Sequence, residues 1–147
     1  MTNIEMAEFY ERDIRKLMEE ISLFKSEENL WKTAGSIKNT SGNLALHITG
    51  GLNYLVGTTL ACTGYTRDRD KEFSAKGVPR KSLLAGLEEL IPMIKETITS
   101  MPGDQMDSPY PRFFDKENAT TSYVLTQLLL HLNYHTGQVN YLRRFLE

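Results

Sequence analysis

The feature that most constrains the fold is a periodic pattern near the C-terminus of the chain. Residues recur there at spacings that alternate between four and three, and they are Val124, Leu128, His131, His135, Gln138, Leu142 and Phe145. This spacing places all of them on one face of an α-helix and predicts that the face packs inside a helical bundle. Polar groups on a buried face cost free energy unless they find partners. The two histidines and the glutamine therefore require partners.

The same periodicity recurs in three earlier segments of the chain. Together the patterns predict helices over about residues 2–24, 41–63, 80–100 and 121–145. No strand-like alternation and no internal repeat stands out in the sequence. Helices of this length joined by three loops are typical of an all-α four-helix bundle, with residues 1–147 forming a single domain.

Polar residues stand where the first, second and fourth helices should begin. Thr2 and Glu5 have the spacing of a capping box, in which each side chain accepts a hydrogen bond from the other residue's backbone amide. Asn39 or Thr40 is placed to cap the second helix, and Thr120 is placed to cap the fourth. The sequence thus marks three helix starts.

Composition limits the kinds of partner that the chain can have. Of its 147 residues 40 % are hydrophobic, and its formal net charge is −2. No basic run favours nucleic acid, and the apolar runs are too short to span a bilayer. No signal peptide follows Met1, and the lone Cys62 cannot form an internal disulfide. We therefore expect a cytoplasmic protein that binds a small molecule and neither nucleic acid nor membrane.

The three histidines carry the strongest chemical signal. His131 and His135 are four residues apart and share one helix face, which is a common half-site for zinc, nickel, copper or iron. The remaining histidine, His47, also falls in a predicted helix. We expect the three to meet at one divalent metal ion. The alternative is that they are ordinary histidines with satisfied hydrogen bonds.

The absence of certain acidic residues limits which kinds of metal site the sequence can form. No acidic residue lies between Glu117 and Glu147, so the fourth helix lacks the Glu-x-x-His motif of di-iron bundles. The glutamate that follows the first histidine of zincin proteases is also missing after His131. A mononuclear three-histidine site remains, and such a site leaves a coordination position open, as catalytic zinc does.

Two polar residues near the histidines could support the metal ligands. Gln138 could hold a histidine or a bound water, and Asn43 lies one turn before His47. The alternative is that both hydrogen-bond the backbone. We expect both to lie behind the metal ligands, where they would contact the ligands but not the metal.

Gly50 and Gly51 lie inside the second predicted helix, where each should cost about 0.5–1 kcal/mol relative to alanine. They follow His47 by about one turn and share its face. We expect them to allow close approach of a neighbouring helix, for which Gly137 offers a matching gap. The alternative is a helix that breaks at the glycine pair.

The connections differ in character. Residues 64–79 carry mixed charges and are expected to form a solvated loop. The first and third loops contain aromatic residues, namely Trp31, Tyr110, Phe113 and Phe114. In an up-and-down bundle the second and fourth helices start at the same end, so these aromatic residues should cover the metal pocket while residues 64–79 lie at the far end. The alternative for the aromatic residues is simple burial.

Two sequence runs resemble those of the DinB/YfiT-like proteins. The first surrounds His47, Asn-Leu-Ala-Leu-His-Ile-Thr-Gly-Gly-Leu, and the second begins at His131, His-Leu-Asn-Tyr-His-Thr-Gly-Gln-Val-Asn-Tyr-Leu-Arg-Arg. The resemblance implies a four-helix bundle, often dimeric, in which three histidines hold a divalent metal. The matching positions are His47, His131 and His135, and zinc or nickel is the favoured ion.

The resemblance also implies a class of chemistry. Reactions assigned within the family centre on metal-dependent transfer of a low-molecular-weight thiol to an electrophile, so we expect a thiol S-transferase-like enzyme. A bound metal can turn a thiol or a water into a nucleophile, and metal-dependent hydrolysis is therefore an alternative. A second alternative is a non-catalytic, metal-stabilised bundle that acts as a dimeric interaction module.

Overall fold

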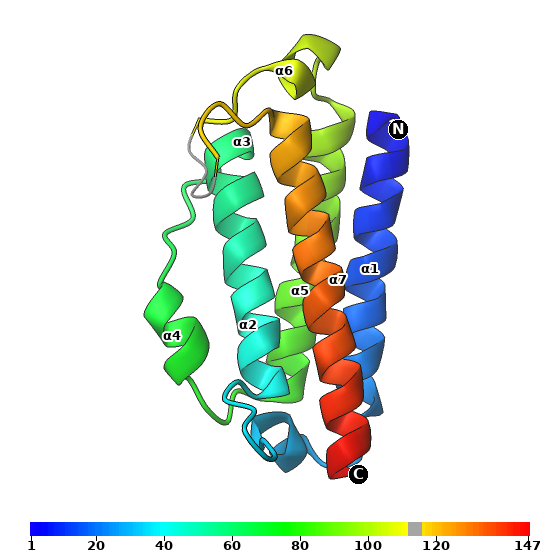
Figure 1. Ribbon diagram of the computed structural model, residues 1–147, viewed down its shortest axis with the longest axis vertical. Helices are drawn as coiled ribbons and strands as arrows, with labels where there is room; N and C mark the ends of the chain where they lie inside the picture. The colour runs from blue at the N-terminus through cyan, green and yellow to red at the C-terminus, as the bar shows by residue number, and fades with distance from the viewer. Residues whose placement is uncertain (112–115) are drawn as a thin grey trace.

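Long helices dominate the computed structural model, which describes residues 1–111 and 116–147 (Figure 1). The long helices are α1 (Asn3–Leu23), α2 (Ser41–Leu52), α5 (Arg80–Thr99) and α7 (Thr121–Leu146). The π-helical turn η2 (Asn53–Thr58) and the short α3 (Thr59–Ala61) extend α2, while η1 (Glu27–Trp31), α4 (Arg69–Ser74) and α6 (Gly103–Asp107) lie in connections. β structure in the described ranges is limited to one isolated bridge, between Pro109 and Thr120. The predicted all-α four-helix bundle is confirmed.

Local sequence signals account for where the helices begin. The Thr2 hydroxyl accepts from the Glu5 amide at 3.1 Å and the Glu5 carboxylate accepts from the Thr2 amide at 2.6 Å, which confirms the capping box. Thr40 and Thr120 cap α2 and α7 by accepting from the amide three residues ahead. A helix long and apolar enough for a bilayer is absent from the described part of the chain.

The directions of the helices differ from the up-and-down order expected from the sequence. Arg80, which begins α5, donates to the carbonyl of Phe24 just after α1 (2.8 Å), and Asn3 at the start of α1 donates to the carbonyl of Met101 after α5 (3.0 Å). At the other end of the chain, the carboxylate of Glu147 accepts from the Lys25 amide at 2.8 Å. Helix α1 is therefore antiparallel to α5 and parallel to α7.

Helix α2 runs in the same direction as α5 and opposite to α7 (Figure 1). The Tyr110 amide donates to the carbonyl of Ala119, just before α7, and the Tyr110 hydroxyl donates to the carbonyl of Leu55 in the α2 extension at 2.7 Å. Since α2 and α5 are parallel, residues 62–79 must return along the whole bundle between them. The predicted topology, in which the second and fourth helices start at the same end, is wrong.

Burial on α7 also differs from the predicted face. Of the predicted face, Val124, Leu128 and Leu142 are buried, whereas Phe145 is 78 % exposed and Gln138 is exposed. The helix has a second apolar row one position beyond the predicted one, and packing against α1 uses it. His131 and His135 consequently lie half-buried at the edge of the core, on the side that faces α2.

Candidate metal centre

The structure brings together the three histidines that the sequence singled out. His47 lies near the start of α2, and His131 and His135 lie near the middle of the antiparallel α7, so the three side chains meet at one level of the bundle. The Nε2 atoms of His47 and His131 are 3.3 Å apart, and those of His131 and His135 are 2.9 Å apart. All three potential ligand atoms lie within 4.8 Å of one another.

These separations suit a single ion. Nitrogens about 2.0–2.1 Å from one metal lie about 3.4 Å apart at a tetrahedral angle and about 2.9 Å apart at a right angle. The observed 3.3 Å and 2.9 Å fall at these two values. Two of the three nitrogen pairs therefore have the spacing of ligands on one ion, and the third pair lies within 4.8 Å. Three imidazole ligands would leave a coordination position of such an ion open.

The second ring nitrogen of two histidines has a defined partner. Nδ1 of His47 lies 3.0 Å from Oε1 of Glu72, and Nδ1 of His135 lies 2.7 Å from Oε1 of Gln138. Because both oxygens are acceptors, each Nδ1 carries the proton and each Nε2 keeps its lone pair for a metal. The sequence suggested a supporting role for Gln138, which this contact fits, but it gave no indication of Glu72.

Burial keeps the cluster in the neutral form that a metal requires. It lowers the pKa of His47 and His135, although the hydrogen bonds that these rings donate to Glu72 and Gln138 act in the opposite direction. For His131, burial and the neighbouring imidazoles lower the pKa to about 4. The three side chains are therefore uncharged at neutral pH, and a metal need not displace protons from them.

Glu72 is held in place by an ion pair that occupies both of its carboxylate oxygens. Nε and Nη2 of Arg67 each lie 2.9 Å from one of its carboxylate oxygens, and Glu72 is only 6 % exposed. Asn43 donates to the backbone carbonyls of Glu72 (3.0 Å) and Ala75 (2.8 Å), which ties α4 to α2. Asn43 thus positions the segment that carries Glu72, and its side chain acts on backbone carbonyls rather than on His47.

The glycine pair in α2 makes room for this carboxylate. A Cβ built on Gly50 would lie 2.1 Å from Oε2 of Glu72, whereas one built on Gly51 would lie 3.4 Å from Arg67. The helix continues through both glycines, so the alternative of a broken helix is wrong. Gly137 has nothing within 4 Å of such an atom, so the expected close approach to α7 is also wrong.

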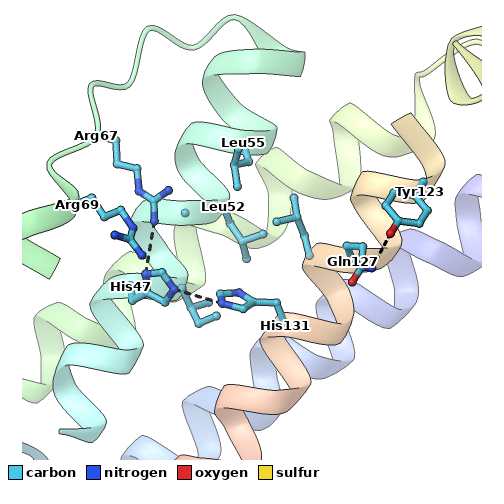
Figure 2. Close-up of a pocket in the computed structure, with 11 residues that line it drawn as sticks. His47, Leu52, Leu55, Arg67, Arg69, Tyr123, Gln127 and His131 are labelled. Carbon is cyan, nitrogen blue, oxygen red and sulfur yellow. Dashed lines mark hydrogen bonds between the residues drawn. The ribbon is translucent and has the colours of Figure 1, made fainter. Parts of the chain in front are cut away.

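The charged connection therefore contributes to the site instead of lying solvated at the far end. Arg67 is 13 % exposed at the side-chain level and Glu72 is buried against His47. Figure 2 shows Arg67 and Arg69 reaching toward His47 from this connection. Mixed charge predicted solvent exposure, but the pairing of Arg67 with Glu72 cancels charge locally and allows both to be buried.

A cavity of about 400 Å³ adjoins His47 and His131. Its walls include Ile48, Leu52, Leu55 and Leu128, and its polar side is formed by Arg67, Arg69, Tyr123 and Gln127 (Figure 2). A space of this size suits a small molecule. The open side of the histidine cluster is thus next to a pocket and not closed by packing.

The predicted aromatic cover is not formed by Trp31 and Tyr110. Trp31 packs against the start of α2, where a Cβ on Gly42 would lie 2.7 Å from the indole, while Tyr110 is buried at the other end against Leu55. Neither residue lines the cavity beside the histidines. Both are used for burial at helix ends, the alternative noted above. Phe113 and Phe114 fall outside the described residues.

The fold and the histidine cluster define an all-α bundle with a candidate metal centre. The family described as "Protein of unknown function (DUF1572)" matches residues 3–147, and the chain belongs to this family. Among solved structures, the crystal structure of a conserved protein from Enterococcus faecalis is similar in fold, with a TM-score of 0.76 and 13 % identity over 98 % of this chain and 96 % of that one. A search of curated proteins found no match.

Proposed function

We propose that the protein is a metal-dependent enzyme that transfers a small thiol to an electrophile. His47, His131 and His135 would hold one divalent ion, with zinc or nickel favoured. The observation that carries the proposal is the convergence of three Nε2 atoms beside a cavity. The DinB/YfiT-like motifs that surround these histidines support the same assignment.

A bound divalent ion would supply acidity, because it lowers the pKa of a coordinated thiol and favours the nucleophilic thiolate. Glu72 and Gln138 hold the rings of His47 and His135 in the orientation that presents Nε2. Leu52, Leu55 and Leu128 form an apolar wall of the cavity beside His47 and His131. In the transfer, the thiol proton passes to solvent, sulfur bonds to the electrophilic carbon, and the leaving group departs with its electron pair.

The state of Glu72 favours thiol transfer over hydrolysis. Hydrolysis at such a site is helped by a carboxylate or imidazole that accepts a proton from the attacking water. The carboxylate of Glu72 is occupied by Arg67 and His47 and sits behind the ligand ring. A thiolate needs no further base once formed, so the residues present suit sulfur better than water.

Metal content and two reactions test the proposal. Protein prepared without added metal is analysed for elements, and we expect about one zinc or nickel ion per chain in the wild type and none after all three histidines are changed to alanine. Thiol-dependent consumption of an activated aryl halide should depend on the metal. Hydrolysis of an activated ester without any thiol would identify a hydrolase, and a metal needed only for folding would identify a structural site.

We also propose that residues 1–147 form one domain of a homodimer located in the cytoplasm. Exposed apolar residues follow one face of α7 and support self-association. They are Leu130 (58 % exposed), Tyr134 (64 %), Tyr141 (78 %) and Phe145 (78 %). Spacings of four, seven and four place them in one stripe, on a part of α7 away from the core.

A further inference from the structure

The polar side of the cavity carries a positive charge that none of the described residues neutralises. Arg67 and Glu72 compensate one another, because both carboxylate oxygens are bonded to the guanidinium. Arg69 also lines the cavity and is exposed, and its guanidinium lies 5.4 Å from the ring centroid of Phe73. No ion pair joins Arg69 to any residue within 1–111 or 116–147. No carboxylate lines the cavity among these residues.

We propose that Arg69 is the binding group for a carboxylate of the small thiol, an inference that rests on the proposed function. A guanidinium presents two parallel N–H groups that match the two oxygens of a carboxylate. Phe73 supports the guanidinium from α4, whose position is fixed by Asn43 and Glu72. The side chain is thus charged, supported and adjacent to the open cavity.

The remaining lining defines the rest of the ligand. Leu52, Leu55 and Leu128 offer an apolar surface between the polar side and the helices. The histidine cluster borders the same cavity through His47 and His131. The ligand class is therefore a short thiol with a carboxylate at one end, the sulfur toward the histidines and methylene groups against the leucines.

Electrostatics favour an anionic ligand in a second way. With Arg67 paired to Glu72, Arg69 leaves one unpaired positive charge on the described lining, and a divalent ion would add two more. A low-dielectric cavity with one sign of charge concentrates ligands of the opposite sign. A neutral thiol of the same size gains nothing from this field.

The test compares two ligands that share the thiol and the carbon chain but differ in charge, the neutral one carrying an added ester methyl group. Cobalt(II)-loaded protein is titrated with 3-mercaptopropionate and with its methyl ester, and thiolate-to-cobalt absorbance reports binding of each. We expect the carboxylate to bind about tenfold more tightly than the ester, because a charge-assisted hydrogen bond at an exposed arginine contributes about 1.4 kcal/mol. A phosphonate analogue that bound more tightly still would overturn the choice of carboxylate.

Variants on one helix separate a direct contact from general charge. Arg69→Gln should abolish the preference for the carboxylate, and Arg69→Lys should keep part of it. Lys71→Gln removes the same charge from α4 at a residue that does not line the cavity, and it should leave the preference intact. Equal affinity of the two ligands in the wild type, or equal effects of Arg69→Gln and Lys71→Gln, would overturn the inference.

Failure of the proposed function would be recognised separately. Cobalt content is measured first, and protein that binds none would refute the metal site while leaving Arg69 testable. Metal-free protein is then titrated calorimetrically with butyrate and with methyl butyrate. Preferential butyrate binding that Arg69→Gln abolishes would support the carboxylate subsite by itself, and absence of that preference would overturn it.

Discussion

Replacing Gly50 by alanine should damage the metal centre without touching a metal ligand. The new Cβ would lie 2.1 Å from Oε2 of Glu72. Contacts closer than about 3 Å are not tolerated, so the carboxylate must retreat by about 1 Å. It is held by Arg67 and His47 at 2.9 Å and 3.0 Å, and the retreat breaks at least one of these contacts.

The expected magnitudes follow from these contacts. Overpacking costs about 1–3 kcal/mol, and alanine returns about 0.5–1 kcal/mol through its helix propensity. Gly50→Ala should therefore lower the free energy of unfolding by about 0–2.5 kcal/mol, with a central value of about 1 kcal/mol. Loss of the partner at Nδ1 of His47 should weaken metal binding by about 10–100-fold.

Gly51→Ala is the matched control, because it makes the same chemical change one residue later in the same helix. Its Cβ would lie 3.4 Å from the end of Arg67, which is ordinary contact. We expect this variant to be more stable than wild type by about 0.5–1 kcal/mol and to bind metal normally. Urea unfolding of metal-free protein and competition with a chromogenic chelator measure the two quantities.

A double variant identifies the cause of the damage. In protein that already carries Glu72→Ala, Gly50→Ala should no longer destabilise the fold, because the carboxylate with which the new Cβ would clash is absent. Equal effects of Gly50→Ala with and without Glu72 would refute the explanation. So would a Gly50→Ala protein that keeps wild-type metal affinity.

Four further outcomes are expected. Because burial lowers the pKa of the histidines, to about 4 for His131, metal release to a chelator should stay small at pH 6.5 and rise steeply toward pH 4. In metal-free protein the unfolded chain binds these protons first, so the free energy of unfolding should fall as the pH drops from 6.5 toward 4, and a flat profile would argue against buried neutral histidines. Leu132→Ala should cost about 2–5 kcal/mol in chemical denaturation, since Leu132 is fully buried, whereas Leu23→Ala at an exposed position of α1 should cost little. Tyr141→Lys combined with Phe145→Lys should convert a dimer into a monomer in light scattering, and a wild-type monomer would contradict the proposed self-association.

The positions of the helices could be predicted from sequence because the signals for them are local. Periodic apolar residues and the caps Thr2, Thr40 and Thr120 placed the ends of the four long helical segments within two residues of those observed. The pairing of His131 with His135 was likewise local, since residues four apart share a helix face. His47 joined them because the sequence holds no other histidine.

Helix direction and the role of Glu72 could not be predicted in this way. Periodicity is the same whichever way a helix runs, so nothing in it separates a parallel from an antiparallel neighbour. A glutamate in a run of mixed charges has the pattern of a surface residue until Arg67 is placed beside it. Gly50 was the one available signal, because an unexplained glycine one turn from His47 implies that something lies against the helix.

The parallel arrangement of α2 and α5 has a consequence for how such a protein can diversify. Because α2 and α5 run in the same direction, α2 ends at the opposite end of the bundle from the start of α5 (Figure 1). Any sequence with this topology therefore needs a long connection across the bundle. Here that connection supplies Arg67, Arg69 and Glu72, whereas the metal-binding candidates all belong to the bundle helices. The candidate metal ligands and the proposed carboxylate-binding residue Arg69 thus lie in separate stretches of the sequence, although Glu72 in the connection also contacts His47. Exchanging residues 64–79 between relatives, with Arg67 and Glu72 kept, should therefore change the proposed carboxylate contact while leaving the three histidines and their support in place.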